Sequence, residues 1–240
     1  MSLTYFGHCA FGWTSLGGTR VLIDPFGNLP DRHWFLKPFP QVRANAVLVT
    51  HDHFDHNAVE RVAGMPAVIT GTTGVNEFDG GDILVRGVPD LHVAGHGGRA
   101  MPNTIFLVEA DGVRYCHIGD NRHDLPGAVR EQIKNVDVLM VTVDDSCHLL
   151  TFTQVDELVR LLSPRVVVPM HYYVSGLTTE SSTLKSPARW LTEQSRVRVL
   201  EGGSIELGPE DLPDHREVWV LQPSEGVPGT GHPPEWGAAL

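Results

Sequence analysis

Six consecutive residues, His51-Asp52-His53-Phe54-Asp55-His56, bring three imidazoles and the carboxylate of Asp55 into one short stretch. They follow an apolar run, residues 46–49, that predicts a buried strand ending at Thr50. The pattern therefore lies at the C-terminal end of a strand, where α/β folds place their chemistry. Imidazole and carboxylate groups suit Zn²⁺ and related metals. Because four donors exceed the need of one open site that also receives ligands from elsewhere, the pattern favours two adjacent metal ions over a solvated, histidine-rich turn.

Three further donors come just after apolar strand-like runs. His92 follows residues 88–91, Asp120 follows residues 113–119, and His171 follows residues 166–170. Each of them alone is more often a structural polar residue. Together with the first motif they form one repeated arrangement, which predicts that the side chains converge on a shared metal site.

Short apolar runs separated by Gly-rich and Asp-Gly turns predict an extensive β structure. The predicted strands are residues 3–6, 21–24, 46–50, 67–70, 83–88, 104–109, 113–118, 136–143, 166–169 and 197–200. The runs 104–109 and 113–118, joined by Asp111-Gly112, predict a hairpin.

Helical periodicity is sparser. Apolar residues recur at i, i+3, i+4 and i+7 from Val155 to Leu162, which predicts a helix with Thr153 as N-cap that ends before Pro164. Shorter helices are expected over 126–134 and 58–62. Early strands, later interspersed helices and no internal repeat together predict an α+β fold, a four-layer αββα sandwich with two sheets face to face and helices outside.

Composition limits the classes of function. Among 240 residues, 18 Lys and Arg against 29 Asp and Glu give a formal net charge of −11, which argues against a nucleic-acid partner and anionic membranes. No apolar run is long enough for a membrane span. The start lacks a basic leader, so a cytoplasmic location is expected.

Cys9, Cys116 and Cys147 show no Cys-x-x-Cys spacing, so disulfides are not expected, and a reactive thiol is an alternative only for the latter two.

We expect residues 1–208 to form one domain and residues 209–240 a C-terminal extension. The run 218–221 of that extension should dock on the domain, and residues 223–240 should form a mobile tail. Residues 25–40 combine four aromatic side chains with several prolines, which predicts an ordered loop. That loop is either a lid or pocket wall, or a surface loop held by its aromatics. The sequence neither requires nor excludes a homo-oligomer.

The metal motif, a later single histidine, Gly119-Asp120 and residues 169–172 (Pro-Met-His-Tyr) together resemble the metallo-β-lactamase fold superfamily of metal-dependent hydrolases. Three other stretches are similar to the branch that contains bacterial L-ascorbate-6-phosphate lactonase, namely residues 5–11, 22–25 and 102–106. The resemblance covers about residues 3 to 205. Its metal motif is specific for the fold and much less so for the substrate.

The resemblance implies a ligand set for two metal ions. His51, His53 and His92 would hold the first, while Asp55, His56 and His171 would hold the second and Asp120 would bridge them. His96 competes with His92. We prefer His92 because its distance to residues 103–106 matches the branch, and we expect His96 to line the pocket.

Four further residues are candidates near this site. A buried carboxylate at Asp24 would orient a ligand imidazole by accepting its other N–H. His8 is expected to face the substrate or to support a ligand, with a structural role as the alternative. His123 and Tyr172 are candidates for contact with the substrate or with water at the metals, and we group them with Asp55 and Asp120 as catalytic candidates.

Two metal ions on either side of a water molecule ionise it near neutral pH, so the sequence predicts a hydrolase that uses a metal-bridging hydroxide. Zinc is the expected metal, and the ligand types also accept manganese or iron. The resemblance to the lactonase branch implies a lactone or ester of a small sugar-acid-like molecule as the substrate. A phosphodiester or phospholipid headgroup is the hydrolytic alternative, although only Arg99, Arg122 and Lys185 lie near the predicted pocket. An iron-dependent redox protein and a non-catalytic sensor remain alternatives of another class.

Overall fold

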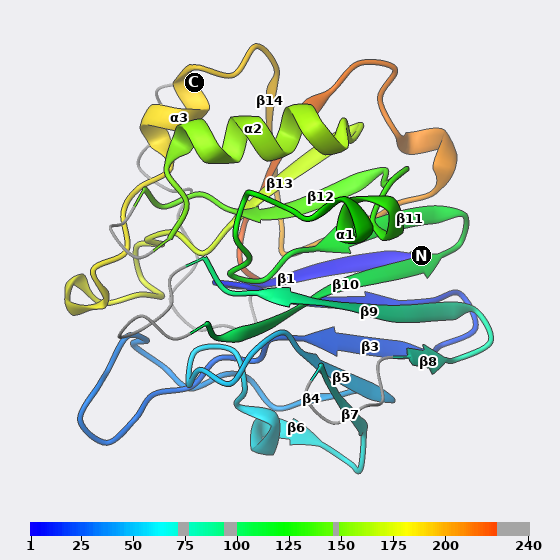
Figure 1. Cartoon of the computed structure of the whole chain (residues 1–240). Coiled ribbons are helices and arrows are strands. Elements are labelled where there is room, and N and C mark those ends of the chain that lie inside the picture. The colour runs from blue at the N-terminus through cyan, green and yellow to red at the C-terminus, as the bar shows by residue number, and fades with distance from the viewer. Residues whose placement is uncertain (72–76, 94–99, 146–148, 225–240) are drawn as a thin grey trace.

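Two β-sheets lie face to face in the computed structural model, which describes residues 1–71, 77–93, 100–145 and 149–224 (Figure 1). The first sheet has the strand order β15-β1-β2-β3-β5-β7 and is antiparallel from β15 to β3, then parallel through β5 and β7. Its strands are β1 (Ser2–Gly7), β2 (Ala10–Thr14), β3 (Arg20–Ile23), β5 (Ala46–Val49), β7 (Ala67–Thr70) and β15 (Ser204–Glu206).

The second sheet has the order β14-β16-β13-β12-β11-β10-β9-β8. Strands β8 to β11 pair antiparallel, as the hairpin prediction requires for β10 and β11, and the remaining pairs are parallel. Its strands are β8 (Glu77–Asp79), β9 (Ile83–Leu91), β10 (Pro102–Ala110), β11 (Val113–His117), β12 (Val138–Thr142), β13 (Val166–Met170), β14 (Val197–Leu200) and β16 (Glu217–Leu221). A separate small parallel pair joins β4 (Val42–Arg43) to β6 (Val62–Ala63).

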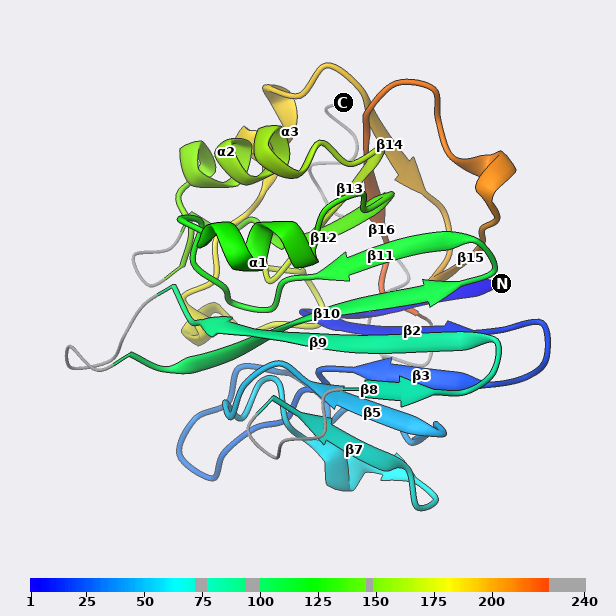
Figure 2. The same ribbon diagram turned by 45° about the vertical axis from the view of Figure 1, so that its right-hand side comes forward.

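The helices cover the outer side of the second sheet, as both ribbon views show (Figures 1 and 2). They are α1 (Gly127–Gln132), α2 (Phe152–Leu162) and α3 (Ala188–Thr192). The outer side of the first sheet carries a second apolar cluster, in which Phe26, Phe35 and Phe39 of the 25–40 loop pack with Val47 and Leu22. In the described residues, this aromatic loop and the 3₁₀ turn η1 (Val59–Arg61) form much of that outer layer.

The main core lies between the sheets because alternate residues of each strand point inward. The rings of Trp13 on β2 and Tyr115 on β11 meet edge to face at 5.9 Å across this interface, and both are fully buried. The predicted α+β sandwich of two facing sheets is therefore confirmed, with α-helices on the second sheet and mainly the aromatic loop and η1 on the described outer side of the first.

Several element boundaries differ from the expectations. The N-cap of α2 is Thr151, not Thr153, because Thr151 and Gln154 form a reciprocal capping box. Residues 58–62 form only the short turn η1 rather than a helix. Strand β2 was not predicted, since Gly12 interrupts its alternation. A Cβ there would lie 3.0 Å from the Phe6 ring, so glycine makes room for that ring.

Strand β16 pairs on both sides, with β13 and β14, so this part of the 209–240 segment belongs to the second sheet. Most of the expected tail, residues 225–240, lies outside the described residues. Within the part of the chain that the structure describes, no helix has the length and apolar character that a membrane crossing requires.

Candidate metal centre

The sequence-predicted donors lie at one edge of the sandwich because the C-terminal ends of the parallel strands meet there. His51 to His56 follow β5, Asp24 follows β3, Asp120 follows β11, and His171 follows β13. The antiparallel strand β9 ends at the same edge and supplies His92. A hydrogen bond of 2.8 Å from Thr104 N–H to the carbonyl of Thr50 joins the two sheets at this edge.

The first group of donors is His51, His53, His92 and Asp120, whose ligand atoms all lie within 4.8 Å of one another. The His51 Nε2 and His53 Nδ1 atoms are 2.9 Å apart, and His92 Nε2 is 3.4 Å from Asp120 Oδ2. His51, His92 and Asp120 are buried, while His53 is partly exposed. This group matches the set expected for the first metal ion.

A second group surrounds His56 and His171. Asp120 Oδ2 lies 3.7 Å from His56 Nε2 and 3.4 Å from His171 Nε2, so Asp120 stands between the two groups. Asp55 Oδ2 is 3.8 and 3.7 Å from the same two nitrogens. His8 donates from Nε2 to Asp55 Oδ2 at 3.1 Å. The structure thus brings together the donors expected for a second ion and places His8 against one of them.

Asp24 orients two imidazoles at once. Its Oδ2 accepts hydrogen bonds from His56 Nδ1 at 2.9 Å and from the Thr50 hydroxyl at 2.7 Å, and its Oδ1 accepts from Thr50 N–H at 2.8 Å. Since the Thr50 hydroxyl donates to Asp24, it accepts from His51 Nδ1 at 3.0 Å. In their neutral forms, both imidazoles therefore present an unprotonated Nε2 to the cluster, which is the form that binds metal.

Asp144 lies beside His171 at an ion-pair distance. It follows strand β12, is fully buried, and places Oδ2 3.5 Å from His171 Nδ1. This residue was not singled out in the sequence, although it follows an apolar strand in the same way as Asp120 and His171.

The loop that carries Asp120 is tightly packed against Asn103 and Thr50. Gly119 has φ +56°, and a Cβ there would meet Asn103 Oδ1 and Thr50 Cβ at 2.7 Å. Asn103 donates to the carbonyl of Ile118 and to Asn121 Oδ1, both at 2.9 Å. Glycine at 119 therefore lets β10 and the end of β5 approach the loop.

Three site residues adopt a left-handed backbone: His8 at φ 56°, Asp24 at φ 46° and His171 at φ 57°. This conformation costs about 1–2 kcal/mol for a side chain other than glycine, and it persists where surrounding contacts over-determine it. The backbone N–H of His171 donates a hydrogen bond to the carbonyl of His8 at 3.0 Å, so the left-handed conformations of these two residues are restrained by one contact.

The charges of the cluster are coupled. Burial lowers the pKa of His171, but the nearby carboxylates of Asp120 and Asp144 raise it by a larger amount. The pKa of His171 therefore lies well above the ordinary value. Burial raises the pKa of Asp120, but His171 and His56 lower it to well below the usual range. By contrast, burial and the neighbouring His56 hold the pKa of His51 well below its ordinary value.

The donor set fits divalent cations. The Nε2 atom of His56 and the Oδ1 atom of Asp120 are buried without a hydrogen-bond partner in the described part of the chain. Buried polar atoms normally have a partner, so these two atoms are suited to coordinate an ion. Imidazole and carboxylate donors in this number match zinc and similar metals.

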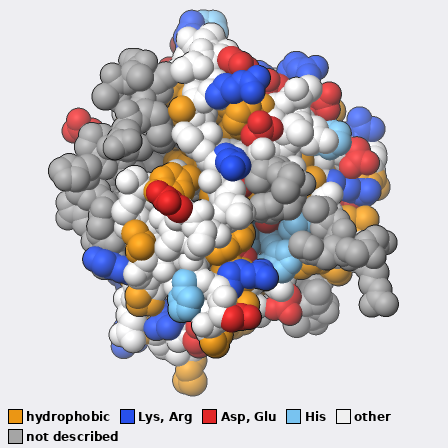
Figure 3. Space-filling model, turned by 90° about the vertical axis from the view of Figure 1, so that its left-hand side faces the viewer, with side chains coloured by type: hydrophobic (Ala, Val, Ile, Leu, Met, Phe, Trp, Pro, Cys, Tyr) orange, Lys and Arg blue, Asp and Glu red, His pale blue; other side chains and the backbone are white. Residues whose placement is uncertain are grey.

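A cavity of about 280 Å³ opens onto the cluster. It is lined by His53, Asp55, His92, Asp120 and His171, and by Arg32, Trp34, Phe54 and Thr183. The space-filling view of this side of the molecule shows histidine side chains at the surface beside a lysine or arginine (Figure 3).

The aromatic loop supplies one wall of this cavity. The Trp34 and Phe54 rings meet edge to face at 5.3 Å, and the Arg32 guanidinium lies over the Phe54 ring at 5.5 Å. The loop is fastened by Asn28, whose Oδ1 accepts from the N–H groups of Trp34 and Phe35, both at 2.9 Å. These contacts support the interpretation of residues 25–40 as a pocket wall, and neither Arg32 nor its role was predicted.

Two catalytic candidates lie outside the cavity lining. His123 is at the surface beside Glu157 of α2, with 3.6 Å between Nε2 and the carboxylate. Tyr172 is buried in the outer apolar cluster, because its side chain packs under the first sheet with Leu177 and Val174. Neither location suits the contact with substrate predicted for it. His96 lies outside the described residues.

Arg122 and Cys116 do not take the alternative roles in the site that the sequence left open for them. Arg122 is engaged by Asp90 at 2.7 Å and so is not available for a substrate. Cys116 is buried in β11, where burial raises its pKa to about 12, and Cys147 lies outside the described residues. Among the described residues, Cys9 is a thiol that lies at the cluster, although no reactive role was expected for it.

Known proteins share this architecture. The family described as "Beta-lactamase superfamily domain" matches residues 2–171. A UPF0173 metal-dependent hydrolase of Archaeoglobus fulgidus is 32% identical over 199 residues, covering 72% of this chain and 83% of the relative. Another, from Pyrobaculum arsenaticum, is 29% identical over 236 residues, covering 85% and 99%.

Solved structures of other proteins share the fold of this chain. A metallo-β-lactamase superfamily protein from Thermotoga maritima matches with a TM-score of 0.70 and 28% identity, covering 92% of this chain and 97% of that one. CmlA, a diiron β-hydroxylase from Streptomyces venezuelae, shares the fold with a TM-score of 0.53 and 19% identity, covering 76% of this chain and 46% of that one. The family match, the relatives and the converging donors lead to one conclusion: the chain belongs to the metallo-β-lactamase superfamily and to its metal-dependent hydrolases.

Proposed function

We propose that the protein is a binuclear hydrolase that opens a lactone or cleaves an ester of a small acidic molecule. The observation that carries this proposal is the pair of donor groups at one sheet edge, with Asp120 between them and a cavity of about 280 Å³ in front. His51, His53 and His92 would hold one ion, Asp55, His56 and His171 the other, and Asp120 would contact both.

When bound, two divalent ions supply Lewis acidity and lower the pKa of water to near neutrality. Zinc is the metal that this donor set favours. The protein's own contribution is to fix the donors. Asp24 holds His56 directly and His51 through Thr50, so both rings keep the required tautomer. His8 holds the Asp55 carboxylate in the same way.

The cavity wall supports a small substrate with a negative charge. Trp34 and Phe54 offer apolar surface on which a ring can pack and from which water is excluded, and the guanidinium of Arg32 lies beside them at the mouth. A guanidinium pairs with a carboxylate through two parallel hydrogen bonds. A lactone or ester of a sugar acid or related hydroxy acid that carries a second, free carboxylate has both features.

Phosphodiester hydrolysis is the alternative, because Arg32 also suits a phosphate group. Arg122, one of the cations first considered for phosphate recognition, is engaged with Asp90 instead. In the described part of the chain, Arg32 is the cation that lines the cavity, and one cation suits a singly charged carboxylate or phosphodiester better than a doubly charged phosphomonoester.

A panel of zinc-loaded assays tests the proposal. Lactones of sugar acids, aryl esters and bis-aryl phosphodiesters are compared for the wild type, for Asp120→Asn, and for Asp111→Asn as a control in the β10–β11 turn. We expect the lactones or esters to be hydrolysed best, with activity lost in Asp120→Asn and kept in Asp111→Asn. Preferred cleavage of phosphodiesters supports the alternative. Hydrolysis that survives both Asp120→Asn and a strong chelator contradicts a metal-dependent site.

A further inference from the structure

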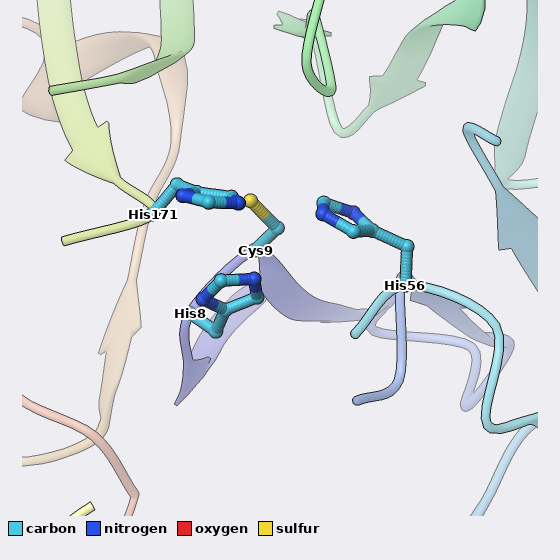
Figure 4. A group of neighbouring side chains, drawn as sticks. All are labelled: His8, Cys9, His56 and His171. Atoms are coloured by element: carbon cyan, nitrogen blue, oxygen red, sulfur yellow. The ribbon is translucent and has the colours of Figure 1, made fainter. Parts of the chain in front are cut away.

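Cys9 is part of the buried core between the sheets, and its sulfur also lies against the second donor group. It lies in the turn between β1 and β2 and is fully buried. Its Sγ and one nitrogen each of His8, His56 and His171 all lie within 4.8 Å of one another. Figure 4 shows the sulfur directed toward the space between the rings of His171 and His56.

The backbone fixes the thiol in this place. His8 adopts φ 56° and its carbonyl accepts the N–H of His171 at 3.0 Å, which ties the turn to the end of β13. The carbonyl of Cys9 accepts from His117 Nε2 at 2.9 Å, which ties it to β11 in the other sheet. Because both neighbouring peptide groups are bonded, the backbone at Cys9 is held in place between the sheets.

Other donors in this group are already oriented for an ion. Asp24 accepts from His56 Nδ1, and the buried Nε2 of His56 has no hydrogen-bond partner among the described residues. His171 Nδ1 faces Asp144, so its Nε2 points to the same space. A buried imidazole nitrogen without a partner, beside a thiol, is an observation independent of the cysteine itself.

We propose that the Sγ of Cys9 is a direct ligand of the second metal ion, together with His56 and His171. This inference rests on the proposed function, since it concerns the same ion. Zinc binds sulfur at about 2.3 Å and imidazole nitrogen at about 2.0–2.1 Å, so ligand atoms around one ion lie less than about 4.5 Å apart. The ligand atoms of this group all lie within 4.8 Å of one another, which is close to that limit.

Coordination by Cys9 has chemical consequences. On binding, the Sγ–H bond breaks, its proton passes to solvent, and the sulfur keeps the electron pair that it shares with the ion. A thiolate ligand selects zinc, cobalt or iron over magnesium and manganese. Asp55, held by His8 at 3.1 Å, then stays as an oxygen donor at the rim of the site.

Cobalt substitution of the full chain tests the proposal. Co²⁺ reports a thiolate ligand through a sulfur-to-metal charge-transfer band in the near ultraviolet, separate from its visible bands. We expect this band in the wild type, in Cys116→Ala and in Cys147→Ala, and its loss in Cys9→Ser. The affinity for zinc at the second site, with His56 and His171, should fall by on the order of tenfold or more in Cys9→Ser.

X-ray absorption of the zinc-loaded wild type gives a second readout that needs no variant, namely a sulfur neighbour at about 2.3 Å from zinc. Bound cobalt with visible bands but no charge-transfer band, or a band that persists in Cys9→Ser, overturns the Cys9 assignment and leaves the hydrolase proposal intact. A wild type that binds neither cobalt nor zinc overturns both.

Discussion

Replacing Asp24 by asparagine should weaken metal binding without a change of backbone. Asp24 has φ 46°, a conformation that asparagine tolerates as well as aspartate does. Its Oδ1 contact with the Thr50 N–H can be kept by the amide oxygen. The amide nitrogen then replaces Oδ2, which accepts from the Thr50 hydroxyl and from His56 Nδ1. An amide nitrogen cannot accept either hydrogen bond.

Two effects follow from this exchange. First, the lost hydrogen bonds to a buried charged group should lower the free energy of unfolding of the metal-free protein by about 2–4 kcal/mol. Second, the new amide N–H₂ favours the His56 tautomer that carries its proton on Nε2, the atom that faces the ion. Loss of such an orienting partner reduces metal affinity about 10–100-fold, which is about 1.4–2.8 kcal/mol.

Chelator competition measures the metal affinity, and urea unfolding of the metal-free protein measures the stability separately. Asp111→Asn is the matched control. Asp111 also has a positive φ, 48°, and it lies at the end of the β10–β11 hairpin away from the cluster. Its replacement by asparagine removes a 3.1 Å ion pair with the amino terminus. We expect its metal affinity to be unchanged. A folded Asp24→Asn protein with metal affinity within about twofold of the wild type would refute the reasoning about His56.

Three other changes probe different parts of the structure. Gly119→Ala forces a Cβ to within 2.7 Å of Asn103 Oδ1 at φ +56°, so we expect a loss of about 2 kcal/mol or more of unfolding free energy in urea, and weaker metal binding in dialysis because the Asp120 loop shifts. Arg32→Ala should raise KM for a carboxylate-bearing substrate about two- to fivefold with little change in kcat, as expected for one exposed charge pair, and should leave KM for a neutral ester unchanged. Equal effects on both substrates would argue against charge recognition. Thr151→Ala removes the capping box of α2 and should cost about 1 kcal/mol, seen as a Tm lower by about 2–4 °C with metal content unaffected.

The position of the metal donors was predictable because they obey one rule. His51 to His56, Asp120 and His171 follow apolar runs that form parallel strands, and such strands end at the same edge of a sheet. Asp144 obeys the same rule and was overlooked only because aspartate after a strand is common.

The remaining parts of the site follow no such rule. Cys9 and His8 occupy a hairpin turn of antiparallel strands, and Arg32 lies in an irregular loop whose course depends on Asn28 and on packing against residues 177–179. Tyr172 neighbours His171 in the sequence, yet it points into the outer apolar cluster. Adjacent residues at a strand end face different environments, so tertiary packing decides which of them reaches the cavity. The expected cytoplasmic location stays a prediction.

Metal content tests the central claim most directly. The wild type, His56→Ala and Asp120→Ala are dialysed against excess zinc, passed through a desalting column and measured by emission spectroscopy, with circular dichroism as a check of folding. The account predicts close to two ions per wild-type chain and a clear loss in both variants. A folded wild type that keeps only trace metal, or folded variants that keep the full amount, would contradict it.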